Sequence, residues 1–144
     1  MSSDTNHRES IRIAHLTMLQ SVILRMGSNS FALKALSATF GSAAVAIMAS
    51  SDKPSPYYAF AATVPILFFW LMDAQYLRYE RAYRRLYEHV RKGEGIDDYS
   101  LEAKPFMADT APVLKLAISW SVSWFYSARI ISLGIVAALI FKDN

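Results

Sequence analysis

The sequence predicts an all-α integral membrane protein with three transmembrane helices. The chain has 144 residues, is 53% hydrophobic and has a mean hydropathy of +0.20. Its apolar residues gather in three stretches of membrane length, residues 31–50, 57–76 and 113–141. A soluble domain of this size does not need such stretches, because about twenty helical residues are what a bilayer requires. We therefore expect a single membrane domain over residues 1–144.

The charge distribution and the lack of cysteine argue against nucleic-acid binding and against thiolate metal sites. The net charge is +3 with a pI of about 9.2, and the positive excess is concentrated in residues 78–92. Beside a membrane span, a basic segment sets topology and contacts anionic lipid more often than it binds nucleic acid. The chain has no Cys, which excludes disulfides and thiolate metal sites. The expected partner is the lipid bilayer, and nucleic acid is not expected.

Residues 8–26 are predicted to form an amphipathic cytoplasmic helix. Its apolar residues and one histidine recur at steps of three or four, and Leu19 and Ile23 widen the stripe. The sequence Gly27-Ser28-Asn29-Ser30 predicts a break, after which Ser or Asn can cap the next helix. The stripe consists of Ile11, His15, Met18, Val22 and Met26.

Residues 31–50 are predicted to form the first span, since twenty helical residues cover about 30 Å. The thirty residues ahead of it are too long for a secretory n-region, so a cleaved signal peptide is not expected. Small residues spaced four apart predict that a second helix packs closely here, and a merely Ala-rich span is the alternative. The two ladders are Ala35, Thr39 and Ala43, and Ala38, Ser42 and Ala46.

The second span is predicted at residues 57–76, after a turn at residues 51–56. Pro65 is expected to kink it. The helix is expected to continue to residue 92 as a basic, coiled-coil-like cytoplasmic arm, because apolar and aromatic residues keep alternating steps of three and four. The arm's partner is the stripe of residues 8–26. The predicted seam is Phe69, Met72, Tyr76, Tyr79, Tyr83, Leu86 and Val90.

The remaining chain is predicted to be an acidic surface connection followed by a third span. Residues 93–112 contain two glycines at their start and two prolines, which favour a connection over a domain. Residues 113–141 exceed one bilayer thickness, so the span proper is expected at about residues 120–141. Trp120, Trp124 and Tyr126 suit the membrane interface.

The distribution of basic residues predicts the orientation of the three spans. The positive-inside rule places the N-terminus in the cytoplasm and Asn144 outside, in a bacterial inner membrane. Only Lys53 and Lys142 lie on the far side. The basic residues on the cytoplasmic side are Arg8, Arg12, Arg25, Arg78, Arg81, Arg84, Arg85, Arg91, Lys92 and Lys104.

Three charged residues, Lys34, Asp73 and Arg129, lie within the apolar stretches. A charge at mid-span costs roughly 2.5–3.5 kcal/mol on insertion scales, so such residues pair or face protein or water. Lys34 and Asp73 each lie sixteen residues from the outer end of their span, which predicts an ion pair with Arg129 as a further cation. The alternatives are markers of the headgroup boundary and a proton or ion relay.

The sequence does not predict an enzyme, a metal site or a cofactor. His7, His15 and His89 have no HxxxH or HExxH arrangement, and His15 is expected to be a helix-packing residue. Ser119, Ser121 and Ser123 have no accompanying base. No phosphate-binding glycine loop is present.

Three segments together resemble a widespread family of small uncharacterised bacterial inner-membrane proteins: residues 15–37, 64–91 and 119–126. The layout is similar to small transmembrane effector modules of anti-phage defence systems, which are thought to oligomerise and breach the inner membrane. The resemblance implies a set of signature positions beyond Lys34, Asp73 and Tyr76. They are Arg25, Met26, Asn29, Ser30, Phe31, Trp70, Glu80, Arg81, Arg84 and Tyr87.

Three function classes follow. The first is a homo-oligomeric membrane effector or channel-like module whose cytoplasmic helices receive a signal. The second is a membrane anchor that recruits a soluble cytoplasmic protein through residues 8–26 and 76–92. The third is a small transporter, which three spans can form only by oligomerising.

Overall fold

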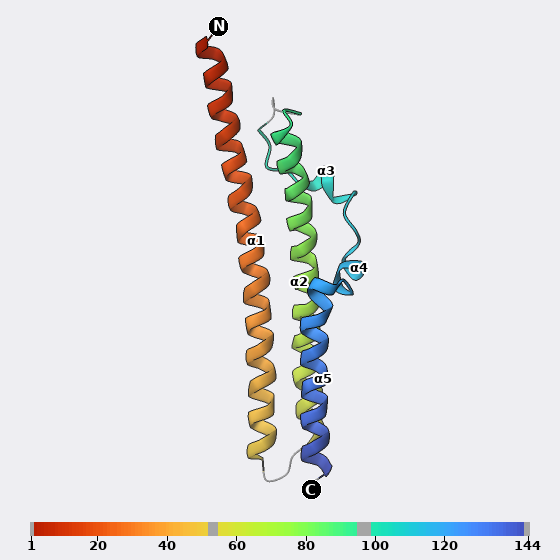
Figure 1. Cartoon of the computed structure of the whole chain (residues 1–144). Coiled ribbons are helices and arrows are strands. Elements are labelled where there is room, and N and C mark those ends of the chain that lie inside the picture. Colours follow the sequence, from red (N-terminus) through yellow and green to blue (C-terminus); the bar gives the residue numbers. More distant parts are fainter. Residues whose placement is uncertain (1, 52–54, 95–98, 143–144) are drawn as a thin grey trace.

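The structure is a computed structural model that describes residues 2–51, 55–94 and 99–142. It is all-helical, with no strand in those ranges (Figure 1). Helices α1, α2 and α5 are each long and apolar enough to cross a membrane. Lys53, Asn144 and half of the predicted turn at residues 51–56 (residues 52–54) lie outside the described residues. The elements are α1 (Ser2–Ser50), α2 (Pro56–Arg91), α3 (Lys104–Met107), α4 (Val113–Ala117) and α5 (Trp120–Lys142).

Helix α1 is continuous over 49 residues, so the break predicted at residues 27–30 is wrong. At 1.5 Å per residue the helix is about 74 Å long. A glycine costs a helix only about 1 kcal/mol, and the residues on both sides of Gly27 pack against α2. Leu19 is fully buried before it and Leu33 is 8% exposed after it. Packing therefore overrides the local break signal.

The buried stripe of α1 follows an eleven-residue period rather than a heptad. His15, Met26, Ser37 and Met48 are spaced by eleven, and all four are buried or half-buried. An eleven-residue period corresponds to about 3.67 residues per turn, close to a straight α-helix. Four of the five residues of the predicted stripe, Ile11, His15, Val22 and Met26, are buried or half-buried. The exception is Met18, which is 54% exposed beside the fully buried Leu19.

Helix α2 joins the second span to the arm without interruption, as the sequence predicts. Ser55 caps its first turn by accepting a hydrogen bond from the Tyr57 amide, and Pro65 lies inside the helix. Beyond the helix, Gly93 has a φ of 83°, a conformation that glycine adopts without steric cost. On the predicted seam, Leu86 and Val90 are buried, whereas Tyr79 is 39% exposed and the small Ala82 takes a buried position beside it.

Residues 99–110, which we call the strap, pass α2 and lie beside it, with α3 on the side away from α1 (Figure 1). His15 of α1 donates a hydrogen bond from Nε2 to the Ser100 carbonyl, at 3.0 Å. Arg78 of α2 donates to the Thr110 hydroxyl and to the Met107 carbonyl, both at 3.3 Å. The predicted surface connection is therefore anchored to residues 8–26 of α1 and to the part of α2 beyond residue 76, which we call the two arms. Ala103 in the strap is only 5% exposed.

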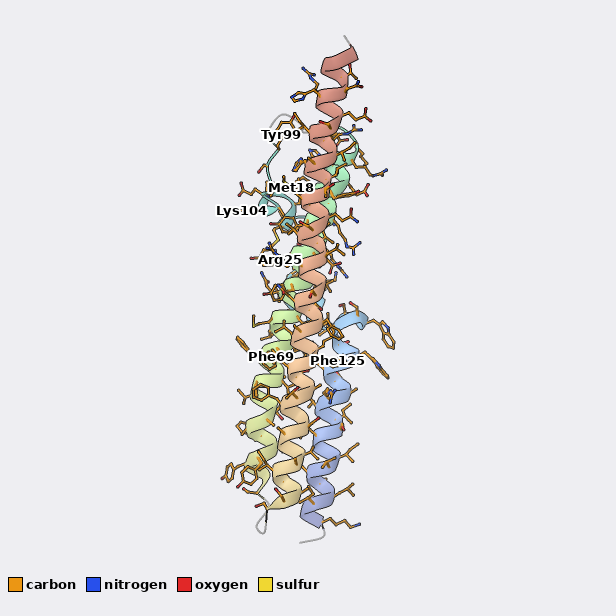
Figure 2. All side chains as sticks on the ribbon, turned by 90° about the vertical axis from the view of Figure 1, so that its left-hand side faces the viewer. Met18, Arg25, Phe69, Tyr99, Lys104 and Phe125 are labelled. Atoms are coloured by element: carbon orange, nitrogen blue, oxygen red, sulfur yellow. The ribbon has the colours of Figure 1, made fainter. Side chains whose placement is uncertain are left out.

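Apolar side chains form two buried clusters, one at the arms and one along the spans. The arm cluster contains Leu19, Leu86 and Val90 with Ala103 of the strap. The span cluster joins α1, α2, α4 and α5. Figure 2 shows nitrogen- and oxygen-tipped side chains gathered on the half of the molecule that carries Arg25 and Lys104. The division between polar arms and apolar spans is thus visible along one long molecule.

Residues 113–119, which we call the elbow, consist of α4 and the two residues that connect it to α5. The two helices are separated by Ile118 and Ser119, and the Ser119 hydroxyl donates to the Leu116 carbonyl at 2.6 Å. Trp120 and Trp124 stack on each other at 5.2 Å and are 76% and 64% exposed. The apolar stretch 113–141 is consequently an elbow followed by one straight span, with its start at residue 120 as the sequence predicts.

Candidate functional site

The structure brings Lys34 and Asp73 together in an ion pair between α1 and α2. The Asp73 side chain is 1% exposed and that of Lys34 is 23% exposed. Equal distance from the outer ends of two antiparallel helices places the two residues at the same height. The low exposure matters because a buried carboxylate without a cation is strongly unfavourable.

Ser30 completes the polar cluster from the helical turn before Lys34. Its hydroxyl donates a hydrogen bond to Asp73 and accepts one from the Lys34 ammonium, the latter at 2.8 Å. Residues four apart lie on the same face of a helix, which explains why both side chains of α1 reach one carboxylate. Each Asp73 carboxylate oxygen thus receives one donor, from Ser30 and from Lys34.

Helix α5 closes the site with Tyr126, which is fully buried. Its ring stacks on Trp70 with centroids 5.9 Å apart and planes inclined by 6°. Among the residues that the structure describes, the hydroxyl has no hydrogen-bond partner of good geometry, and it lies in electrostatic contact with Asp73. Trp70 in turn donates its indole N–H to the Ala117 carbonyl at 2.9 Å. We call Ser30, Lys34, Asp73 and Tyr126 the polar node, because it joins all three spanning helices.

Arg129 does not join the node. Its guanidinium lies over the Phe125 ring, 5.4 Å from the centroid, and it makes no ion pair within the described ranges. A cation held against an aromatic face is stabilised by about 0.5–2 kcal/mol. The structure thus separates the predicted three-charge cluster into an ion pair and a cation–π contact.

The polar node can fix the positions of the three helices along their axes relative to one another. It contains few groups that could act in catalysis or bind a ligand. The one carboxylate, that of Asp73, receives two donors. In the part of the chain that the structure describes, no three His, Asp or Glu side chains come close enough to hold a metal. His89 instead contacts Glu94 at 2.9 Å and the Phe106 ring.

The signature positions divide between the node and the arm surface. Ser30 and Trp70 contribute to the site, and Glu80 pairs with Arg84 one turn away at 2.8 Å. Met26, Asn29 and Tyr87 are half-buried. Arg25, Phe31 and Arg81 are exposed.

Five of the six residues in the small-residue ladders of the first span are exposed, and Ala38 is half-buried. The small residues beside the ladders, Ser37, Gly41 and Ala44, are buried. A Cβ atom on Gly41 would lie 3.9 Å from the Ile66 side chain of α2. The exposed residues form an open face of α1, which we call the small-residue face. It consists of Ala35, Thr39, Ser42, Ala43 and Ala46.

Tyr126 is the site residue that sequence reasoning missed, because it was grouped with the interfacial aromatics. Trp120 and Trp124 are four apart and share one face, whereas Tyr126 is two residues further and points elsewhere. The helical period therefore carries a signal that separates Tyr126 from the two tryptophans. No family model, no curated protein sequence and no solved structure matches the chain.

Proposed function

We propose that the protein is a small homo-oligomeric membrane effector of the bacterial inner membrane, which perturbs that membrane when its cytoplasmic arms are signalled. The observation that carries the proposal is the continuity of α1 and α2. Each runs as one uninterrupted helix from arm to span. A displacement of the arms is therefore transmitted directly to the spans.

Oligomerisation is supported by the large part of the spans that the monomer leaves open. Only 28%, 22% and 17% of the apolar windows of α1, α2 and α5 are buried within the chain. Small residues at interfaces let membrane helices approach closely. The small-residue face of α1 is therefore the surface on which we place a second copy, and three spans need such copies to surround a path.

The proposed orientation has the N-terminus in the cytoplasm and the C-terminus outside. It rests on the ten basic residues that the arms, the strap and the ends of the spans place on one side. The similarity to effector modules of defence systems is one of layout and not of functional motifs.

The alternative is a membrane anchor that recruits a soluble protein. It is favoured by the open groove between the arms, about 510 Å³ in volume and lined by Gln20, Leu24 and Tyr87 among others. Such a groove suits a partner helix.

Release of a self-quenching dye from vesicles distinguishes the two functions. The full-length protein is reconstituted at rising protein-to-lipid ratios. A higher density of protein favours the oligomer by mass action, so the experiment does not need the unknown trigger. The effector proposal predicts release that rises more steeply than protein density, and its loss in Ala43→Phe. The control is Ala61→Phe, an exposed alanine of α2. Absence of release at every ratio, with one stoichiometric soluble protein in a pull-down, would establish the anchor instead.

A further inference from the structure

A second hollow lies between α2 and the elbow, and Trp70, which stacks on Tyr126 of the polar node, is one of its walls. It has a volume of about 650 Å³ and is lined by Leu67, Trp70 and Leu71 of α2 and by Leu114, Lys115 and Ile118 at the elbow. Volumes of about 300–1,000 Å³ are typical of small-molecule sites. The Trp70 N–H is already bonded to the Ala117 carbonyl. Within the hollow, the Lys115 ammonium is therefore the one charged group that a ligand can meet.

The surroundings of this hollow are too apolar to face water. Leu114, Ile118 and Trp120 are 73%, 74% and 76% exposed. A contiguous exposed apolar patch marks a lipid or protein contact. The elbow immediately precedes the α5 span, so these side chains lie at the level where the bilayer begins. Tryptophans at that level are typical of the membrane interface.

Positive charge is available on the polar side of the hollow. Lys115 is exposed at its edge. Arg78 lies seven residues after Leu71, hence on the same face of α2 and about 10 Å further from the membrane. The Asp109 carboxylate is paired with Arg85 at 3.6 Å, and Lys115 forms no ion pair within the described residues. An apolar hollow with cations only at its polar side matches a molecule with an apolar tail and an anionic head.

We infer that this hollow, formed by Leu67, Trp70, Leu71, Leu114, Lys115 and Ile118, binds one acyl chain of an anionic phospholipid, with the phosphate against Lys115. The acyl chain fills the space between α2 and the elbow, and the phosphate receives the Lys115 ammonium. The site fixes the elbow against α2 at the membrane surface. The inference does not depend on the effector function, since a membrane anchor can use the same lipid.

The test uses the purified full-length protein in detergent, titrated with dioleoyl-phosphatidylglycerol or dioleoyl-phosphatidylcholine and measured by native mass spectrometry. We expect phosphatidylglycerol to be retained more tightly. Lys115→Gln should weaken that retention by about fivefold, the factor that one basic side chain contributes at an anionic surface. It should leave phosphatidylcholine retention unchanged. The control, Lys104→Gln on α3, removes an exposed charge from the same side and should change neither.

A second variant tests the apolar part of the site. Leu71 is 48% exposed, so Leu71→Trp fills the hollow without disturbing the core, and it should reduce retention of both lipids. Leu67→Trp, at a position that is 42% exposed, serves the same purpose if the first variant does not fold. Equal phosphatidylglycerol retention in Lys115→Gln and wild type would overturn the inference, as would full retention in the tryptophan variants. An equal loss in Lys104→Gln would show general surface charge and would also overturn it.

Discussion

The Lys34 ammonium of α1 and the Asp73 carboxylate of α2 meet at one height in the molecule, and the Asp73 side chain is 1% exposed. The pair lies where the polar arms give way to the apolar spans. Ser30 and Tyr126 bring the first and third spanning helices to the same carboxylate. The polar node therefore sets the register between the helices, and its loss should lower the stability of the whole molecule.

Removing one partner of the ion pair should cost more than removing both. A buried charge left without its partner costs about 3–5 kcal/mol. Lys34→Met and Asp73→Leu should each lower the thermal stability in detergent, and the double variant should recover part of the loss. Strictly additive losses would mean that the two side chains do not stabilise each other.

The arm contact should depend on Leu19 and not on its neighbour. Leu19 is fully buried and Met18 is 54% exposed. Leu19→Ala should lower the free energy of unfolding by about 2–5 kcal/mol, whereas Met18→Ala should change it by no more than about 0.5 kcal/mol. Chemical unfolding followed by circular dichroism measures both. A larger effect at Met18 than at Leu19 would mean that Met18 lies on the buried stripe, as the sequence predicts.

The strap should be held by His15. His15→Ala removes the hydrogen bond to the Ser100 carbonyl and the edge contact with the Tyr99 ring. Endoproteinase Glu-C should then cut after Glu102, an exposed residue of the strap, several times faster than in the wild type. His7→Ala, at an exposed position of the same helix, is the control. Equal cleavage rates in all three proteins would show that the strap is held by other contacts.

The orientation can be measured directly, because the chain has no Cys. Single cysteines at positions 51 and 144 should react with an impermeant maleimide in intact cells, and one at position 94 should not. Labelling at position 94 in intact cells would refute the three-span orientation.

The sequence predicts the helical class, the three apolar stretches and the equal depth of Lys34 and Asp73, because these depend on composition and residue counting. It does not predict the continuity of α1, since Gly27-Ser28-Asn29-Ser30 is a break signal that packing on α2 overrides. The burial of Tyr126 depends on the rotation of α5, and the attachment of the strap depends on distant contacts such as His15 with Ser100. The helical period separates Tyr126 from Trp120 and Trp124, but it does not say which face of α5 is buried, and no local pattern encodes the attachment of the strap.

The central claim is that copies of the chain meet through the small-residue face of α1, since a monomer cannot surround a path through the membrane. Photo-cross-linking tests this most directly. A benzophenone side chain is introduced at position 43 or, as the matched control, at position 61, both of which are exposed alanines in the spans. After irradiation in native membranes, the account predicts a covalent adduct between two copies from position 43 and little from position 61. Monomer with lipid adducts only at position 43, or equal dimer from both positions, would contradict it.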